Sequence, residues 1–176
     1  MHHIRKATPD DIPVLSGLYD ALNDFLVAGN NYPGWIKGVY PTQADAEFGL
    51  REGNLFVMET EGKLTGSVIL NHHPEPAYHS VKWLMDCDEA EYIVIHTLAV
   101  HPDFLHKGIG KLLMGFADQH AKDSRLKSIR LDVYEHNAPA IQLYEKCGYT
   151  HIDDVDLGLG RYGLHQFRLY EKLTGT

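Results

Sequence analysis

A pair of glycines after an apolar run is the part of this sequence best suited to chemistry with an anion. Gly108 and Gly110 alternate with Lys107, Ile109 and Lys111. A helix start leaves backbone N–H groups without partners, and glycine lets an anion approach them closely. The pattern predicts a site for a phosphorylated ligand, although a tight turn between packed elements would also place Gly-x-Gly here.

The elements around this glycine pair alternate between strands and helices. Residues 91–100 are β-branched and nearly continuous in apolar residues, which predicts a central strand covered on both faces. The apolar stripe of the helix after the glycines is expected to be Ile109, Leu112, Leu113, Phe116 and Ala117. Residues 128–133 predict the next strand, parallel to the first because a helix connects them.

The first seventy residues predict a strand, two helices and a hairpin. Residues 4–6 suggest a strand, and Thr8 is expected to cap a helix with Pro9 in its first turn. The predicted buried face of that helix is Ile12, Leu15, Leu18, Tyr19 and Leu22. Thr42 with Asp45 caps a second helix that ends at Gly53, and residues 54–59 and 64–70 form two antiparallel strands.

The later segments predict a short helix and a second antiparallel pair. Residues 71–90 are polar and irregular, and their pattern is compatible with a mobile loop or a short strand. Residues 137–146 predict a helix with Pro139 in its first turn and Gly148 as its stop signal. Residues 149–157 and 164–172 indicate a terminal pair of strands.

Composition indicates one soluble globular domain over residues 1–176, with 44% hydrophobic and 23% charged residues. No apolar run reaches the length of a membrane span and no signal peptide is visible, so we expect a cytoplasmic protein without a membrane partner. A net charge of −8 argues against a nucleic-acid surface. Cys87 and Cys147 are isolated and the paired histidines lack a complete ligand set, so no metal is expected.

Three motifs can be compared with a known family. Leu98-Ala99-Val100 ends the central strand, His101-Pro102 follows, and Leu105-x-x-Gly108-x-Gly110 opens the helix. Farther on, the chain contains Asn137-x-x-Ala140-x-x-x-Tyr144-x-x-x-Gly148-Tyr149. In these motifs, and in the order of its elements, the sequence resembles the GNAT family of N-acetyltransferases. Leu105 departs from the family pattern, which has Gln or Arg at that position.

The resemblance implies a fold and a cofactor. The fold class is α/β (α+β), a mixed central sheet of about six to seven strands flanked by about four helices, with splayed central parallel strands. The cofactor is acetyl-CoA as co-substrate, with no metal. The implied cofactor-binding residues are Leu98, Ala99, Val100, His106, Lys107, Gly108, Ile109, Gly110, Lys111, Asn137, Ala140 and Tyr144. From the residues alone, Asn137 would also suit a helix start and Tyr144 a core aromatic.

The resemblance also implies an acyltransferase with a base and an acid. His96 lies two residues before Leu98 and matches the His-x-Leu-Ala-Val pattern of arylalkylamine acetyltransferases, so it is the first candidate for the base. Asp132 is the second, at a position where peptide-α-amine acetyltransferases carry a Glu. Tyr144 is the candidate donor to the leaving thiolate. His96 and Asp132 could each instead be a hydrogen-bonded structural residue.

The acceptor is predicted from charge and aromatic residues. Asp20, Asp24 and Glu91 favour a cationic amine, and the loop with Tyr32, Trp35 and Tyr40 adds aromatic surface for the substrate, or else is pinned to the body by these rings. A small amine or polyamine is the first expectation. A peptide or protein amino group is the second, and a homodimer is an expected assembly. A non-catalytic acyl-CoA-binding module is the rival function, because fold does not establish activity.

Overall fold

The computed structural model describes residues 1–175, which divide into two compact units. The first unit consists of Met1–Asn31, Trp35–Leu70 and His96–Leu113. The second consists of Tyr32–Gly34, Asn71–Ile95 and the residues from Met114 onward. The expectation of a single domain over residues 1–176 stays a prediction.

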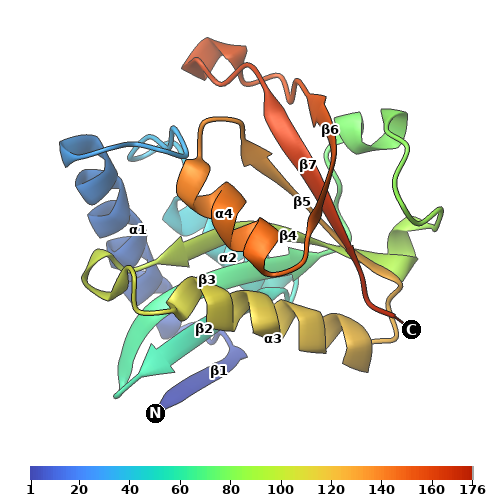
Figure 1. Cartoon of the computed structure of the whole chain (residues 1–176). Coiled ribbons are helices and arrows are strands. Elements are labelled where there is room, and N and C mark those ends of the chain that lie inside the picture. The colour runs from blue at the N-terminus through green and yellow to red at the C-terminus, as the bar shows by residue number, and fades with distance from the viewer. Residues whose placement is uncertain (176) are drawn as a thin grey trace. The chain divides into compact units, whose positions relative to one another are not determined.

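Seven strands in the described residues form one mixed sheet in the order β1-β2-β3-β4-β5-β7-β6 (Figure 1). The strands are β1 His2–Lys6, β2 Leu55–Thr60, β3 Lys63–Asn71, β4 Tyr92–Val100, β5 Ser128–Tyr134, β6 Thr150–Val155 and β7 Phe167–Leu173. The helices are α1 Asp11–Ala28, α2 Gln43–Arg51, α3 Ile109–Asp123 and α4 Ala138–Lys146. The predicted mixed α/β class with six to seven strands and four helices is confirmed.

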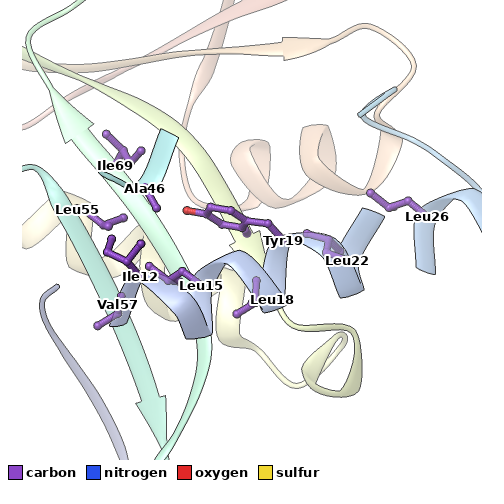
Figure 2. Packing of buried hydrophobic residues seen from close by; sticks show 11 residues of the cluster. Ile12, Leu15, Leu18, Tyr19, Leu22, Leu26, Ala46, Leu55, Val57 and Ile69 are labelled. Carbon is purple, nitrogen blue, oxygen red and sulfur yellow. The ribbon is translucent and has the colours of Figure 1, made fainter. Parts of the chain in front are cut away.

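The core of the first unit lies between α1 and the hairpin of β2 and β3. Figure 2 shows the apolar side chains of α1 directed at these strands, with Ala46 of α2 beside them. The predicted buried face of α1 is confirmed, and Leu26 extends it; its members are Ile12, Leu15, Leu18, Tyr19, Leu22 and Leu26. Tyr19 keeps its hydroxyl 3.4 Å from Ser67 Oγ, so the one phenol in this face has a polar neighbour.

The start of α1 differs from the prediction that Thr8 is its cap. Asp10 occupies the cap position and makes no capping bond with its side chain, whereas Thr8 belongs to the preceding turn. The Asp11 carboxylate accepts bonds from the Thr8 backbone N–H and from Arg5, both at 2.7 Å. The Thr8–Asp11 pairing therefore closes a turn before the helix, and the helix begins two residues later than the sequence pattern indicates.

The second helix and the first hairpin agree with the sequence. Thr42 and Asp45 form a capping box at α2, and Gly53 with φ +70° follows its end. Strands β2 and β3 pair antiparallel around a turn at Glu61 and Gly62, both with positive φ. This pair of left-handed residues gives the tight two-residue turn that matches the twist of a hairpin.

In the second unit, the last strand of the sequence, β7, lies between β5 and β6 in the sheet. The parallel pairing of β4 and β5 joins Tyr92–Val94 to Ser128–Arg130, the first three residues of each strand. Strand β7 pairs antiparallel with β5 on one side and with β6 on the other. The terminal antiparallel pair was predicted from the sequence, but its insertion with β7 next to β5 was not.

In the described part of the chain, the segment between β3 and β4 does not contain the short strand that was one of the two alternatives suggested by its sequence. It contains two short 3-10 helices, η1 Pro76–Ser80 and η2 Glu89–Glu91, and no strand in its described residues. Tyr78 of η1 is 1% exposed and packs with Tyr92 and Leu169. Tyr78 therefore packs this segment against the core of the second unit, and the other alternative, a mobile loop, stays a prediction.

The apolar stripe of α3 is partly different from the prediction. Ile109, Leu113 and Ala117 are buried as expected, but Leu112 is 41% exposed and Met114 is fully buried instead. The prediction was wrong at Leu112 because apolar type alone does not say which edge of a helical stripe meets the core. Among the described residues, no helix is long and apolar enough to cross a membrane.

Candidate functional site

The end of β4 carries an irregularity within the predicted cofactor strand. Thr97 has a φ of +50°, a left-handed conformation that is rare and strained for a β-branched residue. Beyond it, Ala99 is buried, whereas Leu98 and Val100 are half-buried. Burial still alternates from His96 to Val100, with Thr97 and Ala99 buried and His96, Leu98 and Val100 half-buried, as expected when His96 and Leu98 lie on one face of β4.

The loop that opens α3 has a backbone suited to an anion. A short 3-10 helix, η3 Pro102–Phe104, precedes it, and His106 and Gly108 have φ values of +61° and +82°. A Cβ built on Gly108 would meet no atom within 4 Å, so the space beside this backbone is open in the described part of the chain. Lys107 and Lys111 are exposed, and Lys107 Nζ lies 4.9 Å from the centre of the Phe104 ring.

These features fit the diphosphate of the cofactor that the resemblance implies. Two positive φ values in three residues turn the backbone sharply, and no atom of the described chain crowds the position beside Gly108. The positive end of the helix dipole and two lysines favour an anion at the same place. Ile109 is 2% exposed, so any contact from it to a ligand would have to come from its backbone.

A glycine in β3 lets the start of α3 and the end of β4 pack closely against β3 within the first unit. A Cβ on Gly66 would lie 3.0 Å from the Ala99 carbonyl oxygen and 3.0 Å from a methyl group of Leu113. The backbone N–H of His101 continues the contact by donating to the Thr65 carbonyl at 2.9 Å. Gly66 therefore allows the close approach of α3 and the end of β4 to β3, a role that the sequence analysis missed.

Two aromatic residues of the predicted acceptor loop make contacts inside the first unit. Trp35 packs against the core, and its ring meets that of Tyr40 edge-on at 5.5 Å. The Tyr40 hydroxyl lies 2.5 Å from Thr97 Oγ1, and its carbonyl accepts a bond from Asn23. These contacts agree with the alternative that the rings pin the loop, whereas Tyr32, a residue of the second unit, is 39% exposed.

In the second unit, Asn137 caps α4. Its side-chain oxygen accepts a bond from the Ala140 backbone N–H at 3.4 Å, and Gly148 follows the helix end with φ +90°. The helix-start alternative for Asn137 is thus what the structure displays. Its predicted bond to the pantetheine arm and the cofactor contact of Ala140 stay predictions.

Asp132 of β5 is joined to a residue that the sequence analysis did not select. The Tyr78 hydroxyl donates a 2.7 Å hydrogen bond to Asp132 Oδ2 across 54 positions of sequence. Burial raises the pKa of the Asp132 carboxyl, and the bond from Tyr78 opposes that shift. No local sequence signal connects the two residues, because η1 and β5 meet only in the folded unit.

Tyr144 of α4 is a buried phenol, 7% exposed. Burial, and next to it the charge of Asp132, raise its pKa above the usual range for tyrosine. Its ring lies in a cluster with Tyr149 and Tyr170, at centroid distances of 6.3 Å and 6.5 Å. Tyr144 is consequently neutral at physiological pH and has a proton to donate.

The structure thus brings the predicted residues together in two groups. The first unit holds His96, Leu98–Val100 and the residues of the α3 loop, and the second holds Asp132, Asn137, Ala140 and Tyr144. His96 is half-buried in β4. Within residues 1–175, no group of three or more His, Cys, Asp or Glu side chains is arranged to hold a metal ion.

Comparison with known proteins gives one family. A sequence model of the acetyltransferase (GNAT) family matches residues 17–149. The uncharacterized N-acetyltransferase MJ1207 of Methanocaldococcus jannaschii is 29% identical over 153 residues, which are 83% of this chain and 59% of that protein. The chain spans between 23% and 59% of the length of two curated relatives that it matches.

Solved structures agree on the fold. A GNAT-family acetyltransferase of Streptococcus agalactiae superposes with a TM-score of 0.78 at 21% identity, covering 98% of this chain and 95% of the other. The structure of yncA from Salmonella typhimurium, with its cofactor acetyl-CoA, gives 0.67 at 18% identity over 98% and 94% of the chains. The match of the family model covers most of the chain and the fold agrees with it, so this chain belongs to the acetyltransferase (GNAT) family.

Proposed function

We propose that this protein is an acetyl-CoA-dependent N-acetyltransferase that moves an acetyl group to a primary amine, a small amine or polyamine, by direct attack on the thioester. The observation that carries the proposal is the loop of His106 and Gly108 at the start of α3, with its two positive φ values and open space beside the backbone. The family to which the chain belongs supports the same cofactor.

The reaction requires two proton transfers. A lysine-like amine has a pKa of about 10.4, so roughly one molecule in a thousand is neutral at pH 7 and a base must take a proton. The nitrogen lone pair then forms the C–N bond while the C–S bond breaks, and the nitrogen loses a second proton. The thiolate takes the proton of Tyr144, which is replaced from the medium, so amide, thiol and one net proton result.

The scheme assigns tasks to the main predicted site residues. The backbone around Gly108, with Lys107 and Lys111, binds the diphosphate, and Asn137 bonds the pantetheine arm. Tyr144 is the acid. His96 and Asp132 remain the two candidates for the base, and Tyr32, Trp35 and Tyr40 are the candidate acceptor contacts.

Release of free thiol from acetyl-CoA with a panel of amines tests the activity. The unmodified chain should release thiol with at least one primary amine and should bind acetyl-CoA in calorimetry. Binding without turnover on any acceptor would support the rival function of an acyl-CoA-binding module and contradict the enzyme.

A glycine variant tests the cofactor site separately. Gly108→Val should lose detectable acetyl-CoA binding, because the side chain fills the open space and disfavours the left-handed backbone. Gly62→Val is the matched control: Gly62 has φ +77° and the same open surroundings, but it lies in the β2–β3 turn. Equal loss of binding in both variants, or none at Gly108, would contradict the assignment. Lys107→Ala should weaken binding only modestly.

A further inference from the structure

A buried ion pair holds the segment before β4 against the second unit. Arg130 Nε lies 3.1 Å from Glu171 Oε1, and their side chains are 4% and 0% exposed. Glu171 also accepts from the Leu84 backbone N–H at 2.5 Å, and Arg130 donates to the Met85 carbonyl at 2.7 Å. The backbone at residues 84–85 is therefore tied to β5 and β7.

The same arginine sets the position of an aromatic pair. Its guanidinium carbon lies 4.4 Å from the centre of the Trp83 ring, and that ring lies 5.1 Å from the ring of Tyr78. Trp83 Nε1 also donates to the Tyr78 carbonyl at 2.9 Å. Arg130 thus fixes Trp83, and Trp83 fixes both the backbone and the ring of Tyr78.

The result of this arrangement is a phenol aimed at a carboxylate. Tyr78 is 1% exposed, and its hydroxyl donates to Asp132 Oδ2 at 2.7 Å. The bond engages Oδ2 of the carboxylate. Burial and the charge of Asp132 raise the pKa of Tyr78 well above its usual value, so this phenol keeps its own proton.

The other ionisable groups near this pair do not neutralise Asp132. Tyr144 of α4 senses its charge but is itself a neutral phenol. Arg130, two residues earlier on β5, is engaged by Glu171. Glu75 is an acid whose charge raises the pKa of Tyr78, and its backbone carbonyl accepts from the Tyr78 N–H at 2.9 Å. Within residues 1–175, no cation forms an ion pair with Asp132, so its carboxyl is not locked in the charged form as a salt-bridged one would be.

We propose that Asp132 is the general base that takes the proton of the acceptor amine at Oδ1, and that Tyr78 is a positioning residue that holds the carboxylate through Oδ2. The inference rests on the proposed function and chooses between its two candidate bases. Tyr78 neither gains nor loses a proton in the step. The ammonium loses one proton to Asp132, which returns it to the medium before the next turnover.

The pH dependence of kcat at saturating amine tests the pair, since it reports groups in the bound complex. In the unmodified chain, the acid limb of the kcat profile should have the same midpoint as the titration of the Asp132 carboxyl carbon followed by NMR. Tyr78→Phe removes a bond to the charged form, so both midpoints should move up by about one pH unit or more. Asp132→Asn should lower kcat about 100-fold or more without loss of acetyl-CoA binding.

Tyr19→Phe is the matched control, because Tyr19 is also a fully buried tyrosine but its hydroxyl faces the neutral Ser67. It should leave both midpoints in place. This inference would be overturned if the Asp132→Asn variant kept its kcat, or if the acid limb of the kcat profile did not follow the Asp132 titration. Neither result would contradict the proposed acetyltransferase activity. Absence of turnover by the unmodified chain with every amine would overturn the proposed function, and this inference with it.

Discussion

The hydroxyl of Tyr144 is one polar atom on a ring that otherwise packs among aromatic neighbours. Because burial keeps the phenol neutral, its removal takes away a proton donor and little else. Tyr144→Phe should therefore lower kcat about tenfold or more, toward the range seen for the loss of general acid catalysis, and leave acetyl-CoA affinity nearly unchanged. Steady-state kinetics and calorimetry on the same preparation measure the two effects.

Tyr149→Phe is the control for this variant. Tyr149 is buried beside Tyr144 and its hydroxyl donates to Asp118 at 3.3 Å, a bond outside the proposed chemistry. This change should leave kcat unaltered. Equal effects of the two substitutions on kcat would show that the aromatic cluster matters as packing and would remove Tyr144 from the role of acid.

At the scale of elements, the segment between β3 and β4 depends on Glu171. This carboxylate accepts from Arg130, Ser128 and the Leu84 backbone while its own side chain is fully buried. Glu171→Gln leaves the Arg130 charge buried and unpaired, which should cost about 3–5 kcal/mol of unfolding free energy. Denaturant unfolding measures the cost, and hydrogen exchange at the Leu84 amide should become faster.

An exposed ion pair provides the comparison. Lys127 and Glu91 meet at 2.5 Å, but each side chain is more than a third exposed, so water screens the interaction. Glu91→Gln should change stability far less than Glu171→Gln. Similar losses from the two substitutions would mean that the buried pair does not hold the segment.

Local patterns in the sequence predicted most of these elements but not their long-range contacts. The caps at Thr42 and Asn137 and the face of α1 follow from signals within a few residues, so they could be read directly. The left-handed Thr97 and the tight packing at Gly66 depend on neighbouring strands. The bond from Tyr78 to Asp132 depends on a ring position that Arg130 sets from β5, which no local periodicity contains.

For the molecule as a whole, the charge of −8 favours a cationic ligand over an anionic one. Two of the acids predicted to face that acceptor already have cationic partners: Asp24 pairs with Lys37 at 2.9 Å, and Glu91 pairs with Lys127. Asp20 is exposed on α1 and belongs to no ion pair within residues 1–175. The attraction should consequently come from the summed charge and from Asp20 more than from three aligned carboxylates.

This charge pattern predicts a salt-dependent preference for amines with more than one positive charge. The kcat/KM of a diamine should exceed that of a monoamine of equal length at low salt, and the ratio should fall severalfold as the Debye length shrinks from about 30 Å at 0.01 M to about 3 Å at 1 M. Asp20→Asn should reduce the ratio, whereas Glu61→Gln, which removes an equal charge at the exposed β2–β3 turn, should reduce it less. Specificity constants across diamines, arylalkylamines, aminoglycosides and short peptides measure the preference. Faster transfer to neutral or acidic acceptors, or a ratio insensitive to salt, would show that the acceptor is not selected by charge, and a peptide preference would favour an amino-terminal or lysine acceptor instead.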